Sequence, residues 1–233
     1  MDLEHLTLPD FDNSDVPVRD ASTVILVKDA ASNPSILMGQ RGRIAVFMPE
    51  KFVFPGGRVD DDDQQISLSS SMADGCLTRL EKRNDTVSPA TLAVTAIREL
   101  FEETGLVLGQ SGQWDNPPLD WKEFAQAGYL PDASALSFFF RAVTPPGRPR
   151  RFDARFFVAD ATSVANDIEA MPSATDELSH LSWVPLDDVR KLNLAFITEL
   201  VLAELARHLP STEAPSAVPF VHNDSMESQV FWL

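Results

Sequence analysis

Apolar residues occur in short runs along the first quarter of the chain, and these runs predict β-strands. Ser22–Lys28 and Ser35–Arg41 are rich in β-branched and aliphatic residues, with a turn-prone stretch between them, so we expect two neighbouring strands. A third, shorter strand is predicted over 51–57, where KFVFPGG ends in a Pro-Gly-Gly turn. The polar segment at about 60–88 then predicts an inserted loop, with a short helix around 72–81.

The clearest helix signal lies between Ser88 and Gly105. Ser88 suits the N-cap, Pro89 the first helical position and Gly105 the residue just past the end. Apolar side chains recur at helical spacing between these limits and form one stripe: Ala93, Ala96, Ile97 and Leu100. We therefore expect a helix that packs one face against the core.

The rest of the chain continues the alternation of strands and helices. Helices are expected over 117–128 and, as a short helix followed by a longer one, over 186–209, and strands over 135–145, 150–160 and 177–185. The expected fold class is mixed α/β (α+β), an α/β/α sandwich with a mixed β-sheet, in a single domain over 21–209. Residues 1–20 are expected to form an irregular lead-in, and 210–233, which opens with Pro, Ser and Ala, a flexible C-terminal tail.

The charge of the chain restricts its partners. Among 233 residues, 19 Lys and Arg face 35 Asp and Glu, so the net charge is −16. This charge argues against nonspecific binding to nucleic acid or to an anionic membrane. No apolar run approaches the length of a membrane span, and the acidic N-terminus lacks the basic-then-apolar order of a signal peptide, so we expect a cytoplasmic protein with no membrane partner.

Three carboxylates of the predicted helix, Glu99, Glu102 and Glu103, lie within five residues. At about 100° per residue they fall on one arc beside the apolar stripe. Such a run is commonly a solvated helix face that does no chemistry. The alternative is a site for Mg²⁺, a cation that takes oxygen ligands and usually contacts substrate phosphate as well. The Pro-Gly-Gly turn favours this alternative, because glycine lets the backbone approach closely and the Gly56 carbonyl could complete a coordination shell.

This combination resembles the Nudix box, the signature of the Nudix hydrolases. The family pattern is Gly, five residues, Glu, seven residues, and then Arg-Glu-aliphatic-x-Glu-Glu-x-Gly-aliphatic. Gly57 begins it here, and RELFEETGL, residues 98–106, completes it at every specified position. The resemblance extends through ASTVILV, ILMGQR and FVFPGG before the box and LSWVPLDDV after it, roughly from Asp20 to Arg207.

The resemblance implies a hydrolase that cleaves the pyrophosphate of a nucleoside diphosphate linked to another group, with a small-molecule nucleotide conjugate as its partner. Mg²⁺ or Mn²⁺ would be bound by the carboxylates of Glu99, Glu102 and Glu103 and by the Gly56 carbonyl. Arg98 would hold these carboxylates in place through bidentate hydrogen bonds. The catalytic set that the resemblance implies consists of Arg98, Glu99, Glu102 and Glu177.

Two assignments concern proton transfer and substrate binding. The general base is open between Glu99, inside the box, and Glu177, an acid on a distant loop. His180 could also serve, although a lone His beside a strand is more often structural. Arg41 and Arg43 flank a glycine at the end of a predicted strand, and their guanidinium groups suit phosphate, although strand-end arginines are often only surface charge. With Phe54, they are the candidate substrate-binding residues. A second basic group, Arg148, Arg150, Arg151 and Arg155, could attract an anionic substrate or merely pair with surplus carboxylates.

The box of this chain is interrupted. Gly57 and Arg98 are separated by 40 residues, where the family has 13. Counting back from Arg98, the position of the family's first Glu falls on Ala90. Asp60 or Asp63 could replace that Glu, although a solvated acidic loop is the simpler expectation for the aspartate run.

The interrupted box is similar to the branch that contains the peroxisomal coenzyme A diphosphatases and their bacterial relatives. Coenzyme A or an acyl-CoA is therefore a candidate substrate. In the extra signature of the coenzyme A subgroup, Val46 and Glu50 stand where an Arg and a Gly are expected. ADP-ribose, dinucleotides and other nucleotide conjugates consequently stay open as substrates.

Alternatives to catalysis also follow from the sequence. A noncatalytic Nudix-like module that binds a nucleotide to regulate a partner would be expected to lose box carboxylates, and all three are present here. A purely structural protein would not explain why the glycine turn, the Arg and the three Glu occur together in family order. The Leu194–Leu209 helix could form a homodimer interface or serve internal packing.

Overall fold

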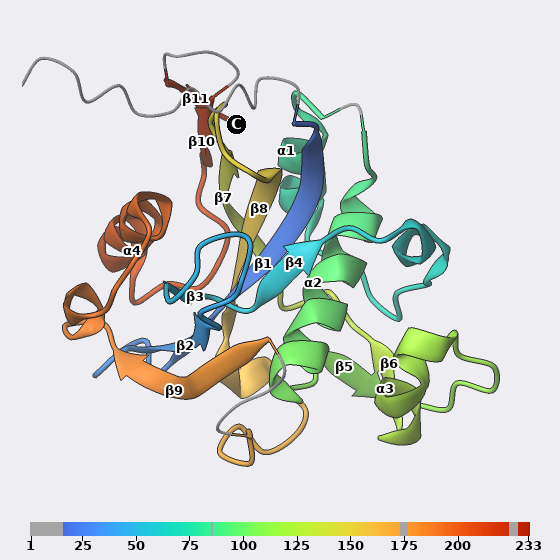
Figure 1. Cartoon of the computed structure of the whole chain (residues 1–233). Helices are drawn as coiled ribbons and strands as arrows, with labels where there is room; N and C mark the ends of the chain where they lie inside the picture. Colours follow the sequence, from blue (N-terminus) through green and yellow to red (C-terminus); the bar gives the residue numbers. More distant parts are fainter. Residues whose placement is uncertain (1–15, 85, 173–176, 224–227) are drawn as a thin grey trace, which may run out of the picture.

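The described residues form a mixed β-sheet with helices on both faces (Figure 1). The structure, a computed structural model, describes residues 16–84, 86–172, 177–223 and 228–233. The strands of the main sheet are β1 Val18–Lys28, β2 Ser35–Arg41, β3 Phe52–Val53, β4 Gly56–Arg58, β7 Ser137–Val143, β8 Arg151–Asp160, β9 Leu178–Pro185, β10 Pro219–His222 and β11 Gln229–Trp232. A separate small sheet contains β5 Gly109–Ser111 and β6 Tyr129–Pro131. The α-helices are α1 Asp74–Glu81, α2 Pro89–Thr104, α3 Lys122–Gln126 and α4 Phe196–His208, and the 3-10 helices are η1 Asp61–Gln65, η2 Leu119–Trp121, η3 Ala161–Ser163 and η4 Val189–Lys191.

The expected fold class and most of the expected elements are confirmed. Among the described strands the order is β11-β10-β7-β8-β1-β2-β3, with β4 paired to β1 and β9 paired to β2. β1 runs parallel to β8 and antiparallel to β2 and β4. The β4 pairing sets Gly56 opposite Thr23 and Gly57 opposite Ser22. The glycine turn is therefore anchored to a strand in the middle of the sheet.

Both faces of β1 are buried. Val24 and Leu26 belong to the core cluster that includes α1 and α2, whereas Ile25 and Val27 belong to the cluster that includes α4. A strand covered on both sides buries every side chain, which explains why its sequence is a continuous apolar run. Successive residues of β1 thus hold the two helical layers on opposite sides of one sheet (Figure 1).

Helix α2 begins and ends where its sequence predicts. The Ser88 hydroxyl accepts a hydrogen bond from the Thr91 amide at 3.1 Å, and Pro89 occupies the first turn. Gly105 closes the helix with a φ of 73°, the left-handed conformation that glycine adopts without strain. These local signals fix the register of the helix, and with it the direction of every acidic side chain it carries.

The inserted segment contains more structure than the predicted loop. The short helix expected around 72–81 is present as α1, which buries Cys76 and Leu80. The aspartate run, expected to be solvated, instead forms η1, and its Asp63 is only 2% exposed. This difference matters for the acidic cluster below.

The expected C-terminal tail is wrong over two segments. β10 and β11 extend the main sheet beyond β7, and Phe220 of β10 is 2% exposed. β10 runs parallel to β7, so the C-terminal residues complete the domain that was expected to end at 209. At the other end β1 starts at Val18, inside the expected lead-in 1–20, of which residues 1–15 lie outside the described part of the chain.

Helix α4 packs on the face of the sheet opposite α2 (Figure 1). It buries Val201, Leu202 and Leu205, which shows the internal packing role expected for this helix as one of two alternatives. Phe196, at its start, is 75% exposed. In the part of the chain that the structure describes, no helix has both the length and the apolar composition needed to cross a bilayer.

Candidate active site

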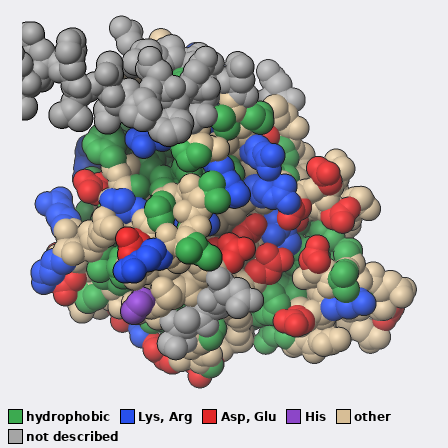
Figure 2. Space-filling view, viewed as in Figure 1, with side chains coloured by type: hydrophobic (Ala, Val, Ile, Leu, Met, Phe, Trp, Pro, Cys, Tyr) green, Lys and Arg blue, Asp and Glu red, His purple; other side chains and the backbone are tan. Residues whose placement is uncertain are grey.

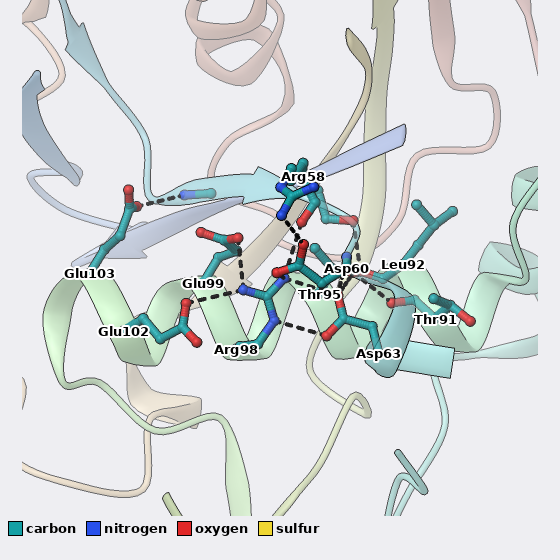
Figure 3. A network of polar contacts seen from close by, with 12 residues as sticks. Arg58, Asp60, Asp63, Thr91, Leu92, Thr95, Arg98, Glu99, Glu102 and Glu103 are labelled. Atoms are coloured by element: carbon teal, nitrogen blue, oxygen red, sulfur yellow. Dashed lines mark hydrogen bonds and ion pairs between the residues drawn. The ribbon is translucent and has the colours of Figure 1, made fainter. Parts of the chain in front are cut away.

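Helix α2 carries the acidic cluster, Glu99, Glu102 and Glu103, on the side that meets β4 (Figure 3). The Ser22 hydroxyl of β1 donates a buried hydrogen bond of 2.7 Å to the Leu92 carbonyl, which ties the helix to the sheet. Glu99 and Glu103 are 9% and 3% exposed, whereas the side chain of Glu102 is 40% exposed. A solvated helix face would leave all three carboxylates in water, so that alternative is wrong for Glu99 and Glu103.

Arg98 is the centre of the hydrogen-bond network around this cluster and is only 5% exposed. Its Nη1 donates to Glu99 Oε1 at 2.9 Å and to Glu102 Oε2 at 3.0 Å. Its Nε and Nη2 donate to the two oxygens of Asp63 at 2.8 and 2.9 Å, and Nη2 also donates to the Arg58 carbonyl at 3.0 Å. A planar guanidinium with five donors matches this arrangement, in which one side chain fixes two carboxylates of α2 and the loop after β4.

Asp63 forms the other half of this bracing. Besides the two bonds from Arg98, its Oδ2 accepts hydrogen bonds from Thr95 Oγ1 at 2.7 Å and from the Asp60 amide at 3.0 Å. The same carboxylate therefore ties η1 to α2 and orients the arginine that holds Glu99. Its role is to position the site.

The sequence offered Asp63 only as one of two possible replacements for the family's first Glu, because that position was counted backwards from Arg98. That count led to Ala90, which is exposed in the first turn of α2 and contacts none of the carboxylates through any hydrogen bond described here. Counting forwards finds the right residue: Gly57, five residues, and then Asp63. The insertion thus follows the box's first acidic position, and an aspartate stands where the family has Glu.

Burial shifts the titration of the acidic cluster. It raises the pKa of Glu99 to about 7, although the charge of Arg98 lowers this value, and it raises the pKa of Glu103 to about 8. Burial also raises the pKa of Glu102. For Arg98, burial disfavours the charged form, but the hydrogen bonds that it donates to Asp63 and the charges of the nearby carboxylates outweigh burial and raise its pKa above the ordinary value. The single positive charge of Arg98 therefore does not restore ordinary pKa values to the buried carboxyls of Glu99 and Glu103.

The glycine turn presses the backbone against two of the carboxylates. Gly56 has a φ of 155°, and a Cβ there would lie 2.5 Å from the Ser22 carbonyl oxygen. A Cβ on Gly57 would lie 2.4 Å from the carboxyl carbon of Glu99. The Gly56 amide donates to Glu103 Oε2 at 2.8 Å. Only glycine at both positions leaves room for this approach.

The donor set fits a hard divalent cation. Glu103 Oε1 is buried and has no hydrogen-bond partner among the described residues, so one carboxylate oxygen is available for a ligand. Mg²⁺ and Mn²⁺ prefer such oxygen donors. Within the described ranges no three acidic, His or Cys side chains already surround one point. Glu99 and Glu102 are turned toward Arg98 instead, so a cation would compete with that guanidinium for their oxygens.

Glu177, the predicted distant acid, lies at this site. It is exposed and directly precedes β9. Its charge raises the pKa of both Glu99 and Glu103, which places it within electrostatic reach of the two buried carboxylates. Two segments far apart in sequence thus supply carboxylates to one region.

The three predicted substrate residues have different surroundings. Arg41 ends β2, and its charge lowers the pKa of Glu103, so its guanidinium lies near the acidic cluster; its buried Nε has no described partner. Arg43 is exposed and its Nε lies 3.1 Å from Glu50 Oε1. Phe54 is 4% exposed inside the core cluster that includes α4, so the expectation that its ring contacts substrate gives way to a packing role.

Basic residues lie beside the acidic side chains near the middle of the face drawn in Figure 2. Of the second basic group, Arg155 is fully buried and forms ion pairs with Asp20 and, at 3.3 Å, with Asp153. Arg151 is also buried and donates hydrogen bonds to backbone carbonyls. Arg155 therefore pairs with carboxylates, as one of the two expectations for this group had it, and Arg151 is occupied by backbone carbonyls.

Comparisons with known proteins agree with this geometry. No model of a known protein family matches the chain. A Caenorhabditis elegans protein whose name assigns it to the Nudix hydrolases is 28% identical over 179 residues, which are 71% of this chain and 51% of that protein. An acyl-coenzyme A diphosphatase of Xenopus laevis is 23% identical over 260 residues, covering 87% of this chain and 67% of that protein. The chain thus spans about half the length of the first relative and two thirds of the second.

A solved structure extends the likeness to three dimensions. The crystal structure of a NUDIX hydrolase from Alicyclobacillus acidocaldarius superposes with a TM-score of 0.64 at 26% sequence identity. The match covers 83% of this chain and 93% of that one.

Proposed function

We propose that this chain, which is similar to Nudix hydrolases, is itself a Mg²⁺- or Mn²⁺-dependent Nudix hydrolase of nucleotide conjugates. It cleaves the diphosphate of a nucleoside diphosphate linked to another group. The observation that carries this proposal is the pairing of a buried acidic cluster with a glycine turn that only glycine can form. Burying Glu99 and Glu103 is costly for the fold, and a bound dication would offset that cost.

The metal ligands proposed are the carboxylates of Glu99, Glu102 and Glu103 with the Gly56 carbonyl. A divalent ion held there would neutralise charge on the diphosphate and lower the pKa of an attacking water. Arg98 keeps two of these carboxylates on one side of α2 through its Nη1. The orientation of Arg98 is in turn fixed by Asp63, the aspartate that replaces the family's first Glu.

The chain's residues then position the reactants and move one proton. Water adds to one phosphorus atom, the bridging P–O bond breaks, and two phosphate-terminated products leave. The water proton passes to a carboxylate, either Glu99 within the cluster or the exposed Glu177, and from there to solvent. Glu177 is reachable from water, which suits repeated protonation and release.

The substrate class rests on similarity and on Arg41. The Xenopus laevis relative is named for acyl-coenzyme A, which makes coenzyme A and its thioesters the first conjugates to test. The guanidinium of Arg41 lies near Glu103 and has a buried Nε without a described partner, which supports the proposal that Arg41 binds a phosphate of the substrate. Arg43 is exposed and already paired, which leaves it a secondary contact.

Release of phosphate-terminated products from a panel of conjugates tests the proposal. The panel contains coenzyme A, an acyl-CoA, ADP-ribose and a diadenosine polyphosphate, each with Mg²⁺, with Mn²⁺ and with EDTA. Hydrolysis of at least one conjugate, lost in EDTA and in Glu102→Gln, supports a metal-dependent hydrolase. Binding of a conjugate without any hydrolysis would contradict it and favour a regulatory nucleotide-binding module.

A further inference from the structure

A cavity of about 450 Å³ opens beside Glu102, at the end of the Arg98 network. The end of α2 forms one wall, η2 and α3 form another, and Pro172 completes the lining. Its lining combines apolar and acidic side chains: Phe101, Leu119, Pro172, Glu102, Asp120 and Glu123. Glu102 is therefore shared between the proposed metal site and this cavity.

The charged side chains that line the cavity are all acidic. Three of its lining residues are carboxylic acids, and none of those lining it in the described part of the chain is Lys or Arg. The guanidinium of Arg98 pairs with Glu102, so the remaining negative charge lies on Asp120 and Glu123, for which no ion pair is described. An anionic group entering the cavity would meet like charges at short range.

We propose, on the basis of the proposed hydrolase function, that this cavity receives the non-nucleotide arm of the substrate and selects arms that carry no negative charge. A diphosphate held at Glu102 has one of its two substituents within reach of the cavity. The apolar part, Phe101, Leu119 and Pro172, covers the carbon atoms of such an arm, and the carboxylates accept hydrogen bonds from its hydroxyl or amide groups. Cations bound at the diphosphate and at Glu102 do not reach Asp120 and Glu123, so these two acids act as the filter.

Two nucleotide sugars that differ in one group test this selection. UDP-glucose and UDP-glucuronate share everything except an uncharged hydroxymethyl group in the first and a carboxylate in the second. Their dissociation constants are measured by calorimetry on the Mn²⁺-loaded protein, with UDP as the probe that lacks an arm. We expect UDP-glucose to bind at least roughly tenfold more tightly than UDP-glucuronate, because one added carboxylate faces several others at close range.

Variants then locate the filter. The double change Asp120→Asn with Glu123→Gln should lower the ratio of the two dissociation constants to below about threefold, because it removes two of the repelling charges. Asp115→Asn, an exposed acid of the same segment that does not line the cavity, is the matched control and should keep the ratio. Leu119→Trp adds bulk at a side chain that is 75% exposed, so the fold is retained. It should weaken UDP-glucose at least about fivefold and leave UDP unchanged.

Several results would overturn the proposal. These are equal binding of the two sugars by the wild-type protein, binding of neither, an unchanged ratio in the double variant, or wild-type binding of UDP-glucose by Leu119→Trp. Calorimetry also separates this proposal from the hydrolase proposal. If the protein discriminates between the sugars as expected but hydrolyses nothing in the substrate panel, the selective cavity is supported and the hydrolase proposal is refuted.

Discussion

Asp63→Asn should destabilise the protein by about 3 kcal/mol, the lower end for breaking a buried ion pair by removing one partner. The Arg98 and Asp63 side chains are 6% and 2% exposed, so water cannot replace the lost charge. Three donors converge on Asp63 Oδ2, from Arg98, Thr95 and the Asp60 amide, while Arg98 Nε alone occupies Oδ1. In either orientation of an asparagine amide at this position, its NH₂ group faces at least one of these donors. Two donors then point at each other, and neither has an acceptor.

Urea denaturation of the metal-free protein measures this loss. Asp61→Asn, one turn away in the same acidic run but exposed, is the matched control and should stay within about 0.5 kcal/mol of the wild type. The Mg²⁺-dependent kcat/KM of Asp63→Asn should also fall by about tenfold or more, because Arg98 no longer holds Glu99 and Glu102 in register. A free energy of unfolding within 1 kcal/mol of the wild type, together with unchanged kcat/KM, would refute the assignment of Asp63 as the bracing acid.

Three further changes test neighbouring parts of the site. Glu102→Gln should lower kcat/KM by about a hundredfold or more with little change in urea stability, since this side chain is 40% exposed; near-wild-type turnover would exclude it as a ligand. Gly57→Ala should reduce both the free energy of unfolding and the Mn²⁺ affinity, because its Cβ would lie 2.4 Å from the Glu99 carboxyl carbon. Wild-type values of both would show that the turn can accommodate a side chain. In EDTA, the free energy of unfolding should fall as pH rises from 4.5 to about 8, because the folded protein holds the Glu103 proton more tightly than the unfolded chain. The stabilisation by this proton is complete below pH 4.5 and lost as pH passes about 8, so Glu103→Gln should flatten the pH dependence of urea stability, and an unaltered slope would count against the burial of this carboxyl.

The parts of the fold that depend on local signals were predictable. The caps of α2 lie within the helix's own sequence, and the continuous apolar run of β1 reflects burial on both faces. The short strands β10 and β11 were missed, because each gains its stability from pairing with a partner rather than from its own four residues.

The candidate site divides in the same way. The three Glu of α2 converge because helical geometry alone brings them together. Asp63 was not assigned, because its bonds to Arg98 join residues 35 apart in sequence, across an insertion whose position in the box is ambiguous when counted from one end. Phe54 was assigned to substrate although it is buried, since a strand residue next to a functional turn gives no sequence signal for which way its ring faces.

A crystal of the protein soaked in Mn²⁺ tests the metal site most directly. The anomalous map should show at least one ion within coordination distance of carboxylate oxygens from Glu99, Glu102 and Glu103, with Glu102 released from Arg98 Nη1. No anomalous peak near α2, with Glu99 and Glu102 still bonded to Arg98 as they are here, would contradict a metal-dependent enzyme.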